Sequence, residues 1–320
     1  MLSKKLRESL EKQHYRIVGK HSSVKICEWT KKSLIDNEKG ACFKEKFYGI
    51  KSHRCCQMSP WFSCQNRCLH CWRAIELNDN LNKKIADNPK EIIWGCVEAQ
   101  KKLLSGFNGN NKVNRKKLFE AQEPMQFAIS LTGEPTLYPK IGELIQELRK
   151  QGKTSFLVTN GLQPIVLKKL NKKKQLPTQI YLSLNAPNKE LYNGWHRSSM
   201  KNAWEKFNET LKLFPKLKTR KVIRMTLVKG LNDKDEQIKE FARMIKIARP
   251  YFVEIKSFMP IGFSRKRLSY NRMLSYQEVF SFSKKLAKAM GYKIEDFHKL
   301  SRVVLIGKDR GMMKIKKNEI

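Results

Sequence analysis

The sequence is short of acidic residues: 29 Asp and Glu stand against 66 Lys and Arg, which gives the 320-residue chain a formal net charge of +37. A deficit of this size lies outside the range of an ordinary soluble metabolic enzyme. It indicates a polyanionic partner, and nucleic acid is the commonest of these. The alternative is a lysine-rich surface that merely solvates the protein, as a hot habitat or nucleotide bias can produce.

Long apolar runs are also missing. No stretch approaches the ~20 apolar residues of a membrane span, and the charged start, residues 1–8, lacks the apolar core of a secretory signal peptide. These absences argue against a membrane-spanning or secreted protein and predict a cytoplasmic one. In a reducing cytoplasm the eight cysteines are expected to be ligands or free thiols, not disulfides.

Three of the cysteines lie close together, in the run Cys64-Gln65-Asn66-Arg67-Cys68-Leu69-His70-Cys71. Four thiolates complete a 4Fe-4S cluster, whereas three leave one iron free for a chelate such as the amino and carboxylate groups of S-adenosylmethionine (SAM). The spacing resembles the radical-SAM signature Cys-x3-Cys-x2-Cys, with His70 where an aromatic residue is usual. A structural zinc site completed by His70 is the alternative, although zinc hairpins normally use two separated ligand pairs.

Short β-rich runs separated by helical stretches predict βα units around a parallel sheet. Apolar residues at helical spacing, over 141–148 and 238–245, predict two of the intervening helices. We expect an α/β barrel domain over 57–300, an N-terminal extension over 1–56 that carries cysteines, and a basic C-terminal tail over 301–320. The predicted strands are 57–63, 125–131, 155–158, 179–184, 222–228 and 251–258.

Ligands gather at the carboxyl ends of the strands in a barrel of this kind. The cysteine run follows the first predicted strand, and Gly133 and Glu134 follow the second. Gly133 lets the backbone approach a ligand, and Glu134 offers a carboxylate to an ammonium group, as in the Gly-Gly-Glu element that this segment resembles. Asn160, Ser183 and Asn185 follow the next two strands and suit a ribose or carboxylate, although the Asn-Gly pair at 160–161 equally favours a tight turn.

Further cysteines precede the signature, at Cys27, Cys42 and the adjacent pair Cys55 and Cys56. Three of these suggest a second cluster. The alternative is a set of buried small apolar residues, a part that free cysteine often plays. Cys96 lies in an apolar helical stretch and is assigned to that alternative.

These segments resemble the tRNA 4-demethylwyosine synthase family, over roughly residues 15–301. The resemblance implies an incomplete (β/α)6 radical-SAM barrel of the archaeal, single-domain type. It implies a carbon-carbon lyase that condenses N1-methylguanosine, beside the anticodon of tRNA-Phe, with pyruvate to form 4-demethylwyosine. The matching segments are 15–27, Cys42-Phe43-Lys44, 52–55, 64–73, 254–259 and 262–265.

The resemblance also assigns roles to residues. Cys64, Cys68 and Cys71 would hold the SAM cluster, and Gly133, Glu134, Asn160, Ser183 and Asn185 would contact SAM. An auxiliary 4Fe-4S cluster that binds pyruvate would be held by Cys27, Cys42 and Cys55, with Cys56 as a substitute for Cys55.

Lys44 matches the family's lysine that is thought to form a Schiff base with pyruvate, chemistry that needs a neutral amine. The alternative is a solvent-exposed, inert lysine, the usual state of any one of the many basic residues.

The expected partners are tRNA-Phe containing N1-methylguanosine and a separate flavodoxin- or ferredoxin-like electron donor, with the chain itself a monomer. Trp72, Trp195 and Phe263 are candidates for stacking on the target base. RNA contacts are expected from the basic clusters 112–117, 172–174, 216–221, 265–267 and 308–317.

Two other functions stay open. One is a different radical-SAM enzyme with an auxiliary cluster, such as a peptide-modifying enzyme; the C-terminal cysteine-rich extension typical of those is missing, because no cysteine follows Cys96. The other is a non-catalytic RNA-binding protein stapled by a metal.

Overall fold

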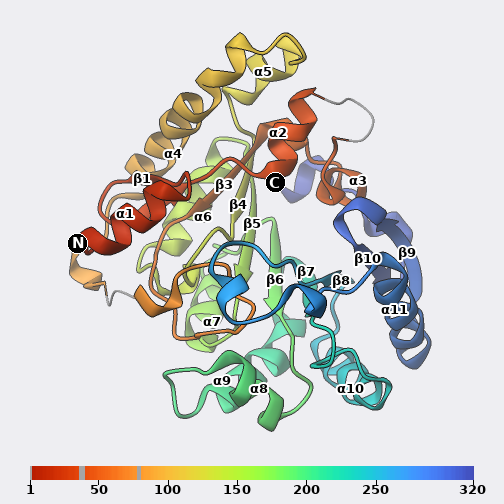
Figure 1. The fold of residues 1–320 in the computed structure, drawn as a ribbon. Helices are drawn as coiled ribbons and strands as arrows, with labels where there is room; N and C mark the ends of the chain where they lie inside the picture. The colour runs from red at the N-terminus through yellow and green to blue at the C-terminus, as the bar shows by residue number, and fades with distance from the viewer. Residues whose placement is uncertain (1, 36–39, 78–80) are drawn as a thin grey trace.

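A single ten-stranded sheet organises the computed structural model, which describes residues 2–35, 40–77 and 81–320. Its strand order is β1-β2-β3-β4-β5-β6-β7-β8-β10-β9 (Figure 1). The strands β3 to β8 are parallel, and the pairs at both ends of the sheet are antiparallel. The strands are β1 Arg16–Val18, β2 Ser22–Val24, β3 Cys55–Ser59, β4 Gln126–Ile129, β5 Thr154–Thr159, β6 Gln179–Ser183, β7 Arg220–Leu227, β8 Phe252–Ser257, β9 Lys293–His298 and β10 Val303–Gly307.

Helices connect the parallel strands and cover the outside of the sheet (Figure 1). None of the helices in the described ranges is long and apolar enough to cross a lipid bilayer. The helices are α1 Lys4–Lys12, α2 Glu28–Ile35, α3 Phe43–Tyr48, α4 Pro89–Leu104, α5 Arg115–Ala121, α6 Ile141–Lys150, α7 Pro164–Lys172, α8 Lys189–His196, α9 Ala203–Leu213, α10 Ile238–Ala248 and α11 Tyr276–Met290.

Five of the six predicted strands match β4 through β8 within two residues, and the two predicted helices match α6 and α10. The first predicted strand, 57–63, overlaps β3 only at residues 57–59, because β3 begins at Cys55 and ends at Ser59. The expected α/β fold with a mostly parallel central sheet is therefore confirmed. The extension before residue 57 supplies β1, β2 and the first two residues of β3; β2 pairs with β3, and β1 pairs with β2.

The two faces of the parallel strands are buried differently. Side chains such as Leu182, Ile223 and Val253 face outward and pack against the helices in the main core. Side chains on the inner face, such as Tyr181 and Phe252, pack against α3 in a second core. The inner face of β6, β7 and β8 is polar at the carboxyl ends, at Ser183, Arg224 and Lys256, so this end of the barrel can bind a polar ligand.

The sequence analysis predicts a basic tail over residues 301–320, whereas residues 303–307 form β10, which lies between β8 and β9. The side chains of Val303 to Ile306 are fully buried, and this burial outweighs the basic character of the surrounding sequence. The backbone N–H of Ile315 donates to the carbonyl of Tyr48 at 3.1 Å, which ties the following segment to α3.

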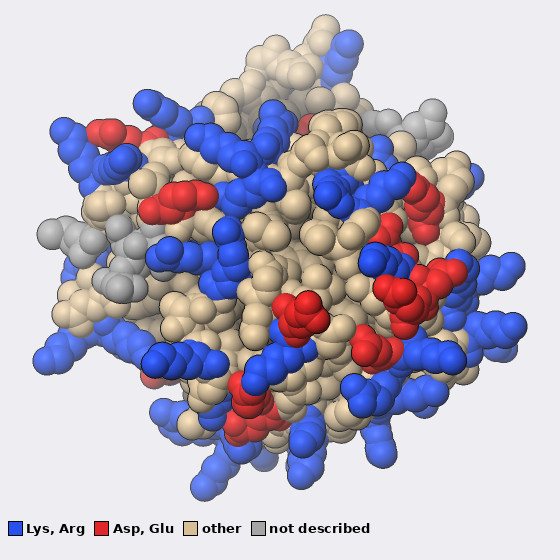
Figure 2. Space-filling model, turned by 60° about the horizontal axis from the view of Figure 1, so that its bottom comes forward, with Lys and Arg blue, Asp and Glu red and all other residues tan. Residues whose placement is uncertain are grey.

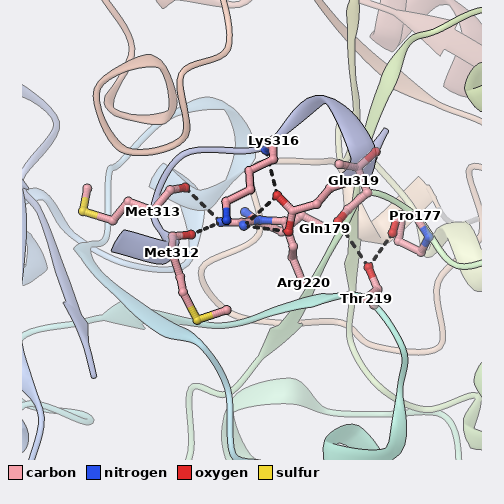
Figure 3. A network of polar contacts seen from close by, with 9 residues as sticks. Pro177, Gln179, Thr219, Arg220, Met312, Met313, Lys316 and Glu319 are labelled. Carbon is pink, nitrogen blue, oxygen red and sulfur yellow. Dashed lines mark hydrogen bonds and ion pairs between the residues drawn. The ribbon is translucent and has the colours of Figure 1, made fainter. Parts of the chain in front are cut away.

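Arg220 binds the last residues of the sequence to the amino-terminal end of the barrel strands (Figure 3). Its buried guanidinium donates to Gln179 Oε1, to the carbonyls of Met312 and Met313, and to the Glu319 carboxylate at 3.1 Å. Since the donors of Arg220 and the carbonyl acceptors are satisfied together, the bottom of the barrel is closed by a hydrogen-bond network, not by apolar packing alone.

Replacing Arg220 with Met should lower the free energy of unfolding by about 3 kcal/mol, because it leaves buried carbonyls and Glu319 without their donor. Denaturant unfolding measures this loss. The control Arg310→Met removes an exposed arginine from the C-terminal segment that Arg220 contacts. It should change the free energy of unfolding by less than about 0.5 kcal/mol. Equal stability of the two variants would contradict the proposed closure.

Candidate active site

A cavity of about 220 Å3 opens at the carboxyl ends of the parallel strands. Its lining includes every residue that the sequence analysis places at the SAM cluster or at SAM: Cys64, Cys68, Cys71, Gly133, Glu134, Asn160, Ser183 and Asn185. These residues come from four separate segments of the chain, so the fold brings together residues that are far apart in the sequence.

Backbone hydrogen bonds hold the cysteine loop against the end of α8. The N–H of Arg67 donates to the carbonyl of His196 at 2.8 Å, and that of Leu69 to the carbonyl of Trp195 at 3.1 Å.

Arg267 secures the same loop from the other side by donating to the carbonyls of Leu69, Cys71 and Arg73 and pairing with Glu76 at 2.7 Å. The three sulfurs are thus carried on a loop with a fixed backbone.

The donor set of this loop fits an anionic iron-sulfur centre. Burial raises the pKa values of the Cys64 and Cys68 thiols. The buried guanidinium of Arg73 donates to the carbonyls of Phe62 and Asn66. Burial opposes the charge of Arg73, yet the neighbouring sulfurs of Cys64, Cys71 and Cys68 raise its pKa, so a fixed cation faces all three.

The zinc alternative does not fit. Within residues 2–35, 40–77 and 81–320, no group of three or more His, Cys, Asp or Glu side chains is close enough to hold one metal ion. Nδ1 of His70 instead accepts a hydrogen bond from Trp195 Nε1 at 2.6 Å. Burial, then His196, Arg224 and Arg267, lower the pKa of His70 to about 3. A 4Fe-4S cluster has its own iron and sulfide frame and so accepts thiolates that are farther apart than the ligands of one ion.

Gly133 allows the Gly-Glu-Pro turn to lie directly on the segment that leads into the cysteine loop. Its φ is +70°, and a Cβ at this position would overlap the carbonyl oxygen of Trp61. Both the left-handed conformation and the close approach require glycine.

The Glu134 carboxylate joins two turns at the cavity. Oε1 accepts from the backbone and hydroxyl of Thr136 and from the hydroxyl of Thr159 at 2.7 Å, while Oε2 accepts from the backbone N–H of Asn160 at 2.8 Å. Burial raises the pKa of Glu134, and these donors oppose the shift. Since Oε1 is filled and Oε2 has one donor, Oε2 is the atom that can accept a bond from a ligand ammonium.

Asn160 combines the two interpretations that its sequence allows. Its Oδ1 accepts from the N–H of Leu162 at 3.0 Å, as in a turn, and its Nδ2 points to Cys64 Sγ at 3.7 Å. Asn185 Oδ1 accepts from the N–H of Thr226, which fixes the amide at the cavity wall. The Ser183 hydroxyl lines the cavity and makes no hydrogen bond to another described residue.

The N-terminal cysteines converge as well. The charges of Cys27 and Cys42 both act on the Cys55 thiol, and burial raises the pKa of Cys42 to about 12. Cys56 faces the opposite side of β3, where its free thiol is fully buried and shares a hydrogen bond with the thiol of Cys96. The structure thus groups Cys55 with Cys27 and Cys42.

Ser52 ties the segments that carry these three cysteines. Its hydroxyl accepts from the backbone N–H of Cys42 at 2.8 Å, and its carbonyl accepts from the Thr30 hydroxyl on α2 at 3.1 Å. Its own N–H donates to Glu45 Oε2 at 2.8 Å. Because Ser52 opens the turn that ends at Cys55, one buried serine connects all three segments.

Lys44 lies inside the barrel, not on the surface. It follows Cys42 in the first turn of α3, and its Nζ sits 5.0 Å from the ring centre of Phe156 and 4.9 Å from that of Tyr181. The solvent-exposed alternative for Lys44 does not describe this structure.

Sequence reasoning missed Arg224 and Lys256, both of which line the cavity. Burial, followed by the charge of Arg224, lowers the pKa of Lys256 to about 8. Their position on the inner face follows from the two-residue period of β7 and β8, which was available in the sequence.

A mostly parallel barrel with three cysteines on the loop after its first parallel strand defines a radical SAM protein. The sequence profile of the "Radical SAM superfamily" matches residues 58–242, and the profile "Wyosine base formation" matches residues 247–308.

The chain is 47% identical over 302 residues to the S-adenosyl-L-methionine-dependent tRNA 4-demethylwyosine synthase of Pyrococcus abyssi, a match that covers 93% of this chain and 87% of that protein. A solved structure described as "Structure of TYW1 with a lysine-pyruvate adduct bound" is 35% identical, with a TM-score of 0.86 and 99% of each chain covered. A second, "Crystal structure of archaeal TYW1", is 33% identical, with a TM-score of 0.78 over 98% of this chain and 100% of that one. This chain belongs to the tRNA 4-demethylwyosine synthase family.

Gly133→Ala should destabilise the protein by at least about 1–2 kcal/mol, the cost of a left-handed non-glycine residue, and should weaken SAM binding because the turn must move off Trp61. Thermal unfolding and equilibrium dialysis with labelled SAM measure the two effects. Gly194→Ala is the control, because nothing lies within 4 Å of its Cβ and its φ is not positive. If both variants bind SAM equally well, the close approach at Gly133 has no functional importance.

Proposed function

We propose that this chain is a radical SAM enzyme that builds the tricyclic base of 4-demethylwyosine from N1-methylguanosine in tRNA-Phe and two carbons of pyruvate. The observation that carries the proposal is the position of Lys44, inside the barrel next to Cys42 and Cys55, where the charge of its amine acts on both thiols. A family structure that contains a lysine-pyruvate adduct supports this chemistry.

In this proposal Cys64, Cys68 and Cys71 hold a 4Fe-4S cluster. When bound, the cluster would supply the electron that cleaves SAM, and SAM would supply the 5′-deoxyadenosyl radical. Glu134 Oε2 accepts a bond from the SAM ammonium. The cavity wall keeps water away from the reacting groups.

Asn160, Ser183 and Asn185 offer amide and hydroxyl groups to the rest of SAM at the same wall. The hydroxyl of Ser183 is uncommitted within the described part of the chain and can bond a ribose or carboxylate without breaking an existing contact.

An auxiliary 4Fe-4S cluster is assigned to Cys27, Cys42 and Cys55. Support comes from their grouping on three segments that Ser52 connects, with Cys56 turned away. Pyruvate then lies between this group and Lys44. The neutral amine of Lys44 attacks C2 of pyruvate and a water molecule leaves, which gives a Schiff base that holds the substrate in the barrel.

Lys44→Ala should reduce formation of the tricyclic nucleoside by at least a hundredfold, because the variant cannot form the Schiff base, while uncoupled SAM cleavage continues. The assay incubates anaerobic protein with SAM, pyruvate, reductant and tRNA-Phe bearing N1-methylguanosine, and detects the nucleoside by mass spectrometry. The exposed Lys51→Ala is the control. Normal product formation by Lys44→Ala would remove the Schiff-base role, and no product from the unaltered protein would remove the proposed function.

The basic clusters predicted to bind RNA divide into surface and interior residues. Arg220 and Lys221 are buried, and Lys221 donates to the carbonyl of Leu217 at 2.9 Å. Arg267 is committed to the cysteine loop. Lys172, Lys173, Lys174 and most of 308–317 are exposed. On the face of the molecule shown in Figure 2, Lys and Arg cover more of the surface than Asp and Glu do.

The aromatic candidates divide in the same way. Trp195 is buried and bonded to His70, so it has no free face for a base. Trp72 lines the cavity with its Nε1 held by the carbonyl of Leu131, and Phe263 is covered by Lys266 at 5.0 Å. Trp72 is therefore the better candidate to stack on the flipped base.

A basic groove of about 960 Å3 on the outer wall of the barrel is the surface that we propose for the RNA backbone. It runs along α10, a helix whose 11 residues span about 16 Å. The cations in its lining make no ion pair with another described residue and can therefore meet phosphates without losing an internal contact. They are Lys212, Lys216, Lys239, Arg243, Lys246 and Arg249.

The triple variant Lys239→Gln, Arg243→Gln, Lys246→Gln should weaken tRNA binding about tenfold or more at moderate salt. The plot of log affinity against log salt should become less steep by about 2 to 3, close to one unit for each lost phosphate contact. SAM cleavage without RNA should not change.

The matched control for that variant, Lys4→Gln, Lys5→Gln, Lys12→Gln, removes three exposed charges from α1. If the two triple variants show equal salt slopes for tRNA binding, the groove contributes only to the net charge of the protein and is not a specific contact surface for RNA. The flavodoxin- or ferredoxin-like donor and the monomeric state stay predictions.

A further inference from the structure

Arg224 and Lys256 are cations of the active-site cavity to which the proposed function gives no task. They project from the inner faces of β7 and β8, where Arg224 lies beside Ser183 and Glu254, and Lys256 beside Thr226. Neither side chain forms a hydrogen bond or an ion pair with another residue in the part of the chain that the structure describes. The ammonium of Lys256 sits 5.8 Å from the ring centre of Phe43.

The other interior arginines near this barrel are fully engaged. Arg73 donates to two carbonyls, Arg220 pairs with Glu319, and Arg267 pairs with Glu76. Arg224 and Lys256 are half-buried in the cavity wall, and a charge that is partly removed from water is stabilised by a partner of opposite charge. Because Arg224 and Lys256 have no such partner among the described residues, we infer that they form a binding site for the anionic group of a ligand.

The local charge balance agrees with an anionic ligand. Lys256 lies within electrostatic reach of Arg224, Glu254, Cys42 and Lys44. Glu254 is the single carboxylate of this group, and its Oε1 already accepts the Tyr48 hydroxyl at 2.6 Å, deeper in the barrel. The three positive charges of Lys44, Arg224 and Lys256 thus outnumber the one negative charge of the Glu254 carboxylate.

The position of the pair decides between two carboxylates. Lys256 shares the cavity with Cys64, Cys68 and Cys71, and its charge acts on Cys42 together with that of Lys44. The pair thus stands beside the amine assigned to pyruvate, whereas the carboxylate of SAM is expected at the free iron of the first cluster.

We propose that Arg224 and Lys256 bind the carboxylate of pyruvate while Lys44 holds its C2 carbon. This inference rests on the proposed function, which supplies pyruvate as the substrate. A guanidinium and an ammonium hold a planar carboxylate at two points, and the bond to Lys44 adds a third. The three contacts fix one orientation of the acid and select 2-oxo acids over neutral ketones of the same size.

The test measures equilibrium binding of labelled pyruvate, and of pyruvamide as the neutral analogue, to the anaerobic reconstituted protein. The unaltered protein should prefer pyruvate about tenfold to a hundredfold, the range for charged hydrogen bonds. In Arg224→Gln and in Lys256→Met this preference should fall to a few-fold. Each substitution removes a cation that contacts the carboxylate of pyruvate, and the neutral amide of pyruvamide does not depend on that cation.

Two controls accompany the variants. Lys284→Met and Arg7→Gln remove exposed cations on α11 and α1 and should keep the full preference. Binding of labelled SAM should be equal in all the proteins. Because the preference is a ratio within one protein, partial loss of folded material in a variant does not alter it.

An unchanged preference in both Arg224→Gln and Lys256→Met overturns the inference and leaves the proposed function intact. Weaker SAM binding with unchanged pyruvate binding also overturns it, since the pair would then serve the SAM carboxylate. Failure of the unaltered protein to bind pyruvate at all overturns the proposed function together with this inference.

Discussion

The alternation of side chains along the parallel strands is the constraint on which the site depends. In β3 it turns Cys55 toward Cys27 and Cys42 and turns the adjacent Cys56 toward Cys96 in the outer core. In β7 and β8 it aims Arg224 and Lys256 into the cavity. A slip of one residue in any of these strands would exchange the two faces and separate the groups that the chemistry needs together.

Much of the fold was predictable because β4 to β8 are short runs rich in apolar and β-branched residues, separated by helical stretches. The strands β1 and β2 have three residues each and give no such signal. The run Val303 to Ile306 does carry it, but the many basic residues that follow favour an exposed tail. Its partners on β8 and β9 are what make it a strand.

The site divides along the same line. Residues within a short motif, such as Cys64, Cys68 and Cys71, were identified from local spacing, and the structure brings them to one cavity. Arg224 lies in none of the matching segments, and Lys256 lies in one, 254–259, that gave it no role. Their proximity depends on the register of two strands. The sequence also did not distinguish Arg267 from its exposed neighbours Arg265 and Lys266, because all three are basic. Only the structure shows that Arg267 binds the cysteine loop.

The insertion of β10 between β8 and β9 has a consequence for biosynthesis. A ribosome delivers β8 and then β9, but β9 pairs with the sheet through β10, which emerges after both. Until residues 303–307 are free, the nascent barrel presents the unpaired backbone edge of β8 to other chains, a common start of aggregation. The sheet is therefore complete only after residues 303–307 have left the ribosome.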